Sequence, residues 1–267
     1  MSSKPKTSLT SLNDVAEANK RFYDQIADIY DQVDSRRGQK NNHLWVNSII
    51  DQIIELLHKN NLKTSAFLDA GSGTGLLAHR ALNRFDRLIL VDISKKMLDR
   101  ISIPETNKIC SDVSFIPVKA ASFDAVGGFA TLHHLKSTQI FFDEVYRILR
   151  PGGVLYTDHD IESQFVCNFR PLLIAYRKCF DHGKDFLRCC PEASEKDYIL
   201  SEFHGDRGLS GQELEKQLVG SGFKIIRLDY HWEGMGVISS MIQGIGVSKW
   251  FKRRGLAPLI RILATKP

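Results

Sequence analysis

The sequence predicts an α/β fold built on a doubly wound, mostly parallel sheet of seven strands. Short apolar runs alternate along the chain with stretches in which apolar residues recur every three or four positions, a pattern typical of strands followed by helices. The first run leads directly into a glycine-rich loop and then into a helical pattern. With 267 residues, 43% of them hydrophobic and 25% charged, the chain is long enough for one large domain with a filled core.

Two amphipathic helices are expected before the first strand. Residues 1–12 are polar and are expected to form a flexible N-terminus, whereas residues 13–267 are expected to form a single domain. Apolar residues recur at helical spacing in two groups, which are Phe22, Tyr23, Ile26, Ile29, Tyr30 and Val33, and then Trp45, Ile49, Ile50, Ile53, Ile54 and Leu57.

The strands of the predicted sheet are short buried runs, most of them separated by helices. Ser94 is expected to cap the helix after the second strand, and Ser210 with Glu213 forms the capping-box pattern of a later helix. A helix over Gln139–Leu149 is expected to stop at the segment Arg150–Gly153. Alternation of this kind implies parallel strands with right-handed crossovers. The expected strands are 66–70, 88–92, 108–112, 122–128, 154–157, 223–230 and 258–265.

One long segment departs from this alternation. Residues 161–209 show no short strand and helix rhythm, so we expect a mostly helical insertion there that lies over the functional edge of the sheet as a lid. The core of the domain is then formed by residues 62–160 and 210–267. We expect the N-terminal helices and the insertion to build the pocket for the molecule on which the protein acts.

Composition argues against several other classes of protein. No apolar run approaches the roughly 18 residues of a membrane-spanning helix, and the first residues lack the apolar stretch of a secretory signal, so a cytoplasmic location is expected. The five cysteines form no CxxC pair, which suits reduced thiols. Trp250, Phe251 and the cations Lys252–Arg254 would allow transient contact with an anionic membrane surface, although a solvated basic loop is the simpler interpretation.

The strongest functional signal follows the first two strands. Asp69 ends the first strand, and the loop from Gly71 to Gly75 follows it, whereas Asp92 ends the second strand. Ligands of open α/β sheets bind at the carboxyl ends of the strands, where glycines let a ligand lie against the backbone. We therefore expect a ligand site at this loop.

A dinucleotide-binding fold is the main rival for this pattern. Its GxGxxG fingerprint would need a glycine at position 76, where the sequence has Leu76. Asp69 would also place negative charge beside a pyrophosphate that seeks the amides of a helix N-terminus. Both details favour a cationic ligand over a dinucleotide.

The ordered motifs from Phe67 to about Tyr156 resemble the core of the class I S-adenosylmethionine-dependent methyltransferases, in the broad group that includes ubiquinone and menaquinone biosynthesis enzymes. Asp69–Gly75 resembles the first motif, Phe123–Val126 the fourth strand, and Leu149–Gly153 the turn before the fifth strand. The resemblance implies a Rossmann-like fold, S-adenosyl-L-methionine as cofactor and methyl transfer as activity.

The resemblance also implies roles for individual residues. The loop would cradle the methionine portion of the cofactor, Asp92 would accept hydrogen bonds from the ribose hydroxyls, and Asp112 would accept one from the adenine amino group. Tyr23 and Tyr30 either close over the cofactor or serve only as packing residues. The expected cofactor-binding residues are Asp69, Gly71, Ser72, Gly73, Thr74, Gly75, Asp92, Ile93, Asp112, Val113, Phe129, Tyr23 and Tyr30.

Three histidines are candidate catalytic residues. Methyl transfer needs alignment and exclusion of water, and a general base matters only when the acceptor must lose a proton. His133 and His134 follow the fourth strand and are also explained by packing, so His159, after the fifth strand, is the preferred base. Asp158, His159 and Asp160, with His204 or Asp206, are an alternative metal-binding set, but no metal is expected, because successive residues of a strand point to opposite faces and cannot all bind one ion.

A small-molecule methyl acceptor is favoured, with transfer to oxygen or carbon ahead of nitrogen. Enzymes that methylate the amino groups of bases often carry an Asn or Asp, two prolines and an aromatic residue after the fourth strand, where this chain has Gly127–Thr131. No basic stripe interleaved with aromatics indicates nucleic-acid binding. The alternatives are an RNA or protein methyltransferase, and a noncatalytic module that binds the cofactor for regulation.

Overall fold

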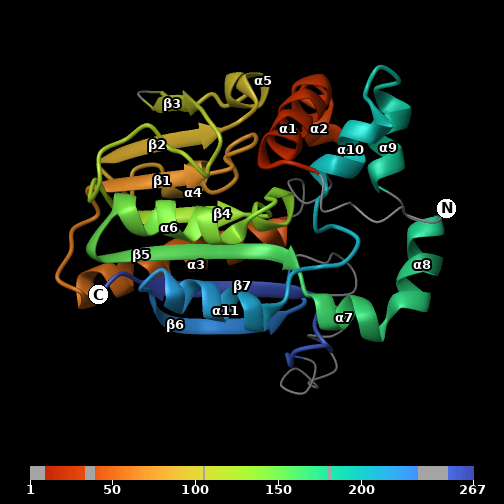
Figure 1. Cartoon of the computed structure of the whole chain (residues 1–267). Coiled ribbons are helices and arrows are strands. Elements are labelled where there is room, and N and C mark those ends of the chain that lie inside the picture. Colours follow the sequence, from red (N-terminus) through yellow and green to blue (C-terminus); the bar gives the residue numbers. More distant parts are fainter. Residues whose placement is uncertain (1–9, 34–39, 105, 180–181, 234–251) are drawn as a thin grey trace.

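A seven-stranded sheet forms the centre of the fold, as the sequence predicts (Figure 1). The computed structural model describes residues 10–33, 40–104, 106–179, 182–233 and 252–267. The strand order is β3-β2-β1-β4-β5-β7-β6, and only β7 runs antiparallel to its neighbours. The strands are β1 (Ala66–Ala70), β2 (Arg87–Asp92), β3 (Asn107–Cys110), β4 (Phe123–Phe129), β5 (Leu149–Ile161), β6 (Lys224–His231) and β7 (Leu259–Thr265).

The central strand β1 lies where the strand order changes direction. It pairs in parallel with β2 on one side and with β4 on the other, so that Asp69 lies beside both Leu90 and Gly127. All five residues of β1 are buried. Ligands of open α/β sheets bind at such a switch point, outside the carboxyl ends of the strands. The topology therefore places the loop after β1 where a ligand is expected.

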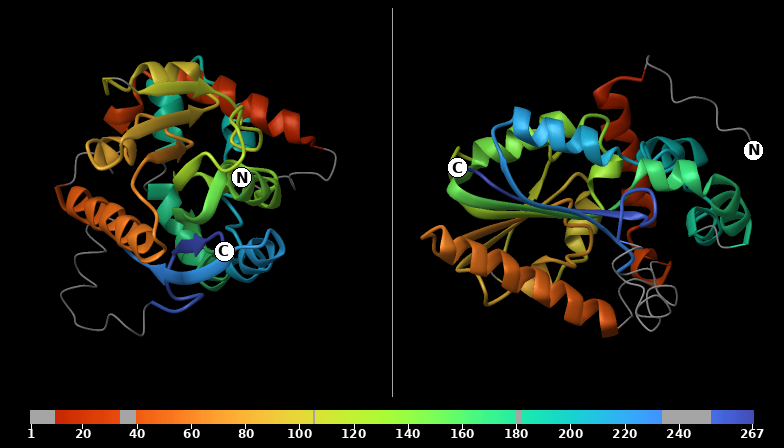
Figure 2. Two further views of the ribbon diagram at one scale, coloured as in Figure 1. Left: turned by 90° about the vertical axis from the view of Figure 1, so that its left-hand side faces the viewer. Right: turned by 90° about the horizontal axis from the view of Figure 1, so that it is seen from below.

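Helices cover both faces of the sheet (Figure 2). On one face, α3 and α4 pack against the aromatic side chains of Phe67 and Tyr156. On the other face, α6 and α11 pack against a second core that includes Phe123 and Phe223. The bounds of these helices are α3 (Lys40–Lys59), α4 (Ala78–Ala81), α6 (Thr138–Ile148) and α11 (Gly211–Gly220).

Side-chain caps fix the helix starts that the sequence predicts. The Ser94 hydroxyl accepts a hydrogen bond from the Met97 amide at the start of α5 (Lys95–Asp99). The Ser210 hydroxyl likewise accepts one from the Glu213 amide at the start of α11. Each cap satisfies one of the amides that a helix N-terminus leaves without an intrahelical partner.

Helices from two distant parts of the chain gather beyond the carboxyl ends of the parallel strands (Figure 1). Phe22 and Ile26 of the N-terminal helices form a small core with Ala193, and the Arg21 guanidinium donates two hydrogen bonds to Asp197. We call this group of helices the cap. It consists of α1 (Leu12–Ile26), α2 (Tyr30–Val33), α9 (His182–Cys189) and α10 (Glu195–Ser201).

The segment after β5 is helical, and its first two helices lead away from the sheet to the cap (Figure 1). They are α7 (Ser163–Asn168) and α8 (Arg170–Cys179), and α9 and α10 follow. We propose that residues 161–209 act as one insertion over the site. Among the described residues, no helix is both long enough and apolar enough to cross a membrane.

The strand β5 differs from the sequence prediction in two ways. It begins at Leu149, so the segment Arg150–Gly153 continues directly into the strand instead of separating a helix from it. Its register against β7 shifts between Asp158 and Asp160, and His159 has a positive φ of 68°. Because of this irregularity, the side chains of β5 near His159 do not alternate between the two faces of the sheet as the sequence predicts.

The basic segment near the C-terminus is described only in part. Trp250 and Phe251, which the sequence analysis considers as membrane anchors, lie outside the described residues. Arg254 pairs with the buried Glu162 at 3.2 Å, and Lys252 lies 3.6 Å from Glu233. These two cations therefore have acidic partners within the fold.

Candidate cofactor and acceptor site

Backbone conformation makes glycine necessary in the loop after β1. Gly71, Gly73 and Gly75 all have positive φ angles, of 69°, 52° and 88°. A Cβ atom on Gly71 would also lie 2.7 Å from the Thr131 hydroxyl oxygen, which is closer than real Cβ atoms approach other atoms. The glycines thus allow both the left-handed turns and the close approach of the segment after β4.

Hydrogen bonds to neighbouring strands hold this loop in place. The amides of Gly71 and Ser72 both donate to the Val91 carbonyl of β2, at 2.9 and 3.0 Å. The Thr74 hydroxyl donates to Asp31 of α2 at 2.6 Å. The loop is therefore fixed from the sheet side and is also tied to the cap.

The two acidic residues at the strand ends have different local roles. The Asp69 carboxylate is buried and accepts a hydrogen bond from the Ala78 amide at 3.0 Å, at the first residue of α4. The Asp92 carboxylate accepts hydrogen bonds from the Gly73 amide at 2.8 Å and the Ser94 amide at 2.9 Å. Asp92 therefore joins the glycine loop to the segment after β2.

The environment of Asp92 disfavours its charge. Burial is the largest effect and raises the pKa of this carboxyl to about 6, against the lowering effect of its backbone hydrogen bonds. The nearby Asp24 carboxylate raises this pKa further. No lysine or arginine within the described ranges forms an ion pair with Asp92. A ligand that donates hydrogen bonds or carries positive charge would stabilise the ionised form.

The remaining residues predicted to contact adenine lie next to Asp92. The Asp92 carbonyl accepts a hydrogen bond from the Ser111 amide at 3.0 Å, which brings the end of β3 beside the end of β2. Asp112 is half-buried and accepts one from the Ser114 amide at 2.8 Å. Val113 is buried, and Ile93 is half-buried. The chain thus brings together the predicted ribose and adenine residues.

The predicted tyrosines lie in the cap. The Tyr23 hydroxyl is 3.3 Å from His134 Nε2, and the Tyr30 ring stacks on Phe186 of α9 at 5.7 Å between centroids. Asp24, next to Tyr23 in the chain, accepts a hydrogen bond from the Ser94 hydroxyl at 2.7 Å. The cap therefore contacts both the loop after β2 and the histidines after β4.

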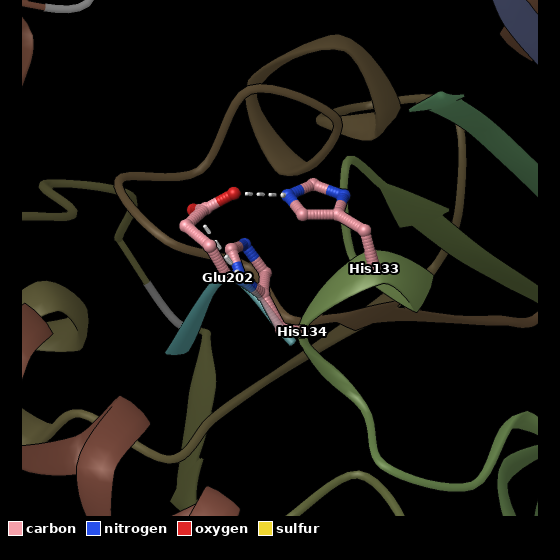
Figure 3. Close-up of side chains that lie close together, drawn as sticks. All are labelled: His133, His134 and Glu202. Carbon is pink, nitrogen blue, oxygen red and sulfur yellow. Dashed lines mark ion pairs between the residues drawn. The ribbon is translucent and has the colours of Figure 1, made fainter. Parts of the chain in front are cut away.

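His133 and His134 lie beside Glu202 at the end of α10 (Figure 3). His133 Nε2 is 3.7 Å from one carboxylate oxygen of Glu202, and His134 Nδ1 is 3.7 Å from the other. His133 Nδ1 is 2.8 Å from the buried Asp160 carboxylate. Sequence reasoning did not find Glu202, because it lies in an insertion without a recognisable motif.

His159 belongs to a second cluster. Its Nδ1 atom is 3.0 Å from Asp158 Oδ1, and its ring stacks on Phe129 with centroids 4.2 Å apart. Trp45 of α3 also contacts this ring, at 4.9 Å between centroids. Only 4% of the His159 side chain is exposed. The predicted alternation of Asp158 and His159 is wrong, because the irregularity in β5 brings these two side chains together.

Asp158 is a buried carboxylate whose negative charge is balanced by nearby basic groups. Arg261 of β7 donates to it at 2.7 Å, and His231 Nε2 of β6 lies 2.7 Å from it. Burial alone would raise its pKa, but His231, His159 and Arg261 together lower it well below the usual range of an aspartic acid. The Tyr156 hydroxyl also donates to this carboxylate. Sequence reasoning missed His231 and Arg261, which lie far away along the chain.

Comparisons with known proteins agree with this geometry. Residues 68–157 match the family model described as a methyltransferase domain. An uncharacterised methyltransferase of Mycobacterium tuberculosis is 34% identical over 98 residues, covering 35% of this chain and 50% of the relative. A demethylmenaquinone methyltransferase of Chlamydia trachomatis is 28% identical over 140 residues, covering 50% and 58%. The chain thus spans about half the length of the curated relatives it matches.

A solved structure shows the same fold. An S-adenosylmethionine-dependent methyltransferase from Clostridium acetobutylicum aligns with a TM-score of 0.57 and 16% sequence identity, covering 91% of this chain and 98% of that protein. The chain thus has a doubly wound α/β fold with a glycine loop and two acidic residues at the carboxyl ends of neighbouring strands. Together with the match over residues 68–157, these features show that the chain is similar to the class I S-adenosylmethionine-dependent methyltransferases.

Proposed function

We propose that the protein transfers a methyl group from S-adenosylmethionine to a small-molecule acceptor, with oxygen or carbon as the accepting atom. The observation that carries this proposal is the position of Asp92. Its buried carboxylate accepts a hydrogen bond from the Gly73 amide, and its pKa is raised to about 6. A carboxylate that is kept buried beside a glycine loop is suited to accept hydrogen bonds from a nucleoside with positive charge.

The residues around the loop fit this cofactor. The backbone of Gly71–Gly75 would hold the methionine portion, and Asp92 would hold the ribose hydroxyls. Ile93, Asp112 and Val113 would surround the adenine, and Phe129, Tyr23 and Tyr30 are proposed to close the site. When bound, the cofactor supplies a methyl group activated by a sulfonium charge.

The contributions of the chain itself are positioning and exclusion of water. The hydrogen bonds from Thr74 to Asp31 and from Ser94 to Asp24 tie the cap to the loop, so that the cap can shield the reacting atoms. His159 is enclosed by Phe129 and Trp45, which supports a positioning role for it. His133 and His134 lie at the cap and are better placed to contact an acceptor.

The nature of the cap supports a small acceptor. Its helices bury an apolar core around Phe22, and Tyr23 presents a hydroxyl next to His134. The relative named demethylmenaquinone methyltransferase carries the name of an enzyme with a small-molecule acceptor. These observations favour a small acceptor over RNA or protein.

The proposal is tested by following a radioactive methyl group from the cofactor to the molecules of a cell extract. The full chain is incubated with S-adenosylmethionine that carries a tritiated methyl group and with an extract divided by size. We expect label in the small-molecule fraction and at least about tenfold less with Asp92→Asn, because one hydrogen bond to a charged group is worth about 1.5–3 kcal/mol. Label in RNA or protein would contradict the small acceptor, and no label in any fraction would indicate a noncatalytic binding module.

A further inference from the structure

The cluster of His133, His134 and Glu202 has the dimensions of a metal site (Figure 3). Each residue offers one ligand atom, and these atoms all lie within 4.8 Å of one another. His133 Nε2 and Glu202 Oε2 are 3.7 Å apart, which is too long for a hydrogen bond. Ligand atoms about 2.1 Å from a tetrahedral ion are separated by about 3.4 Å. The pair at 3.7 Å would therefore have to close by about 0.3 Å, and a pair at the 4.8 Å limit by about 1.4 Å, which changes of side-chain torsion can supply.

Hydrogen bonds orient His133 as a ligand. Asp160 Oδ1 lies 2.8 Å from His133 Nδ1 and also accepts a hydrogen bond from the His133 amide at 2.9 Å. Since an ionised carboxylate only accepts, the proton of the ring belongs on Nδ1, and the lone pair of Nε2 faces Glu202. A carboxylate behind a histidine is the usual outer partner of a metal-binding imidazole.

The same reasoning applies to His134. Its Nδ1 atom is 2.9 Å from the Ser201 carbonyl oxygen, which can only accept a hydrogen bond. The proton therefore belongs on Nδ1, and the lone pair lies on Nε2, which is 3.3 Å from the Tyr23 hydroxyl. That hydroxyl is also 3.5 Å from Glu202 Oε1, so it lies at the same cluster.

This cluster and the one around Asp158 differ in net charge. The carboxylates of Glu202 and Asp160 lie beside both histidines, and with the neutral imidazoles that a metal ligand requires these groups would carry net negative charge, which favours a cation. In the other cluster, Asp158 already pairs with the buried Arg261 at 2.7 Å. A metal ion there would lie next to a buried guanidinium, so that cluster is unsuited to a cation.

We propose that His133, His134 and Glu202 bind a divalent transition-metal ion of the zinc type, with Asp160 as positioning residue for His133. Two imidazoles and one carboxylate are a donor set that suits zinc and leaves one position open. Thr131, two residues before His133, packs against Gly71 and donates a hydrogen bond to the Ala70 carbonyl, so the segment that carries the histidines is joined to the glycine loop. On the proposed function, an oxygen atom of the methyl acceptor would occupy that position.

The untagged full chain is first treated with a chelator and desalted. Titration with Co²⁺ and Zn²⁺ then tests the site. We expect one equivalent per chain, and a Co²⁺ absorption spectrum of nitrogen and oxygen ligands without a thiolate charge-transfer band. Glu202→Gln and His133→Gln should each weaken binding at least about a hundredfold, and Asp160→Asn about 10–100-fold. The control His58→Gln, at an exposed position of α3, should leave the affinity unchanged.

Several results would overturn the site. These are less than a tenth of an equivalent bound, a thiolate band that assigns the metal to cysteines, or equal affinity in the wild type and in Glu202→Gln. The wild-type stoichiometry and spectrum decide the matter if a variant fails to fold. Uptake of S-adenosylhomocysteine, measured on the same samples, separates the two proposals: its absence refutes the cofactor site alone, and absent metal binding refutes the metal site alone.

Discussion

Asp92 and Asp158 are both buried carboxylates near the carboxyl ends of parallel strands, but their surroundings are opposite. Asp158 accepts from Arg261 and lies within hydrogen-bond distance of two histidines, and its pKa is lowered well below normal. Asp92 has backbone amides and a neighbouring carboxylate around it, and its pKa is raised to about 6. The fold thus balances the charge of Asp158 with basic groups, whereas Asp92 forms no ion pair with a lysine or arginine of the described residues.

On the proposed function, this difference separates a structural carboxylate, Asp158, from a cofactor-binding one, Asp92. A buried charge that the protein neutralises contributes to the cohesion of β5, β6 and β7, and its removal should appear as lost stability. A buried charge that is left without a cation costs stability in the free protein, and its removal should appear as lost binding.

The largest effect is expected for Asp158→Asn. The change leaves Arg261 without its main buried partner, and removing one member of a buried ion pair costs about 3–5 kcal/mol. We expect a loss of this size in the free energy of unfolding, measured with urea. Asp112→Asn, at a half-buried carboxylate, is the matched control and should change stability by less than about 1 kcal/mol. A similarly small change for Asp158→Asn would show that the cluster is not structural.

Asp92→Asn should weaken cofactor binding without lowering the stability of the free protein. We expect affinity for S-adenosylhomocysteine to fall about 10–100-fold, because a hydrogen bond to a charged group is worth about 1.5–3 kcal/mol. Stability without ligand at pH 7 should equal or exceed that of the wild type, by up to about 3 kcal/mol, because the variant removes a poorly solvated charge whose pKa is raised from 3.8 to about 6. Calorimetry and urea unfolding measure the two quantities, and a variant that loses stability but keeps affinity would reverse the assignment.

A pH dependence follows from the raised pKa of Asp92, which is about 6. The carboxyl is ionised above this value and accepts hydrogen bonds best in that form, so affinity for S-adenosylhomocysteine should fall by about tenfold from pH 7 to pH 5. Since the pKa is raised on folding, this group makes the free protein less stable as pH rises from about 4 to above 6. Asp92→Asn should remove both trends, and an unchanged pH profile in that variant would assign them to another group.

The smallest effect is expected at the contact between the two parts of the cap. Arg21 donates two hydrogen bonds to Asp197, but its side chain is 52% exposed. Exposed ion pairs contribute at most about 1 kcal/mol, so Arg21→Ala should lower stability by less than that. Limited proteolysis should nevertheless cut the insertion faster, since the contact joins α1 to α10. Unchanged cleavage would mean that the apolar core around Phe22 holds the cap alone.

The central fold could be predicted because its signals are local. The run Ala66–Ala70, the glycines after it and the cap residue Ser94 each determine a nearby backbone conformation, and the structure confirms the strand, the loop and the helix start. The antiparallel β7 and the long β5 depend on pairing between distant segments. Such pairing leaves little trace in a single sequence.

The side-chain clusters could be predicted only in part for the same reason. The sequence indicates His133, His134 and His159 as candidates because they follow strands. Their partners Glu202, His231 and Arg261 come from an insertion and from two late strands, and no fixed spacing connects them to the histidines. The irregularity of β5 at His159 is also an exception to the rule that neighbouring residues of a strand face opposite sides of the sheet.

A crystal structure with S-adenosylhomocysteine would test the central claim most directly. We expect both ribose hydroxyls to lie within about 3 Å of the Asp92 carboxylate and the amino-acid portion to lie along the backbone of Gly71–Gly75. A ligand bound elsewhere, with Asp92 still bonded only to the amides of Gly73 and Ser94, would contradict it.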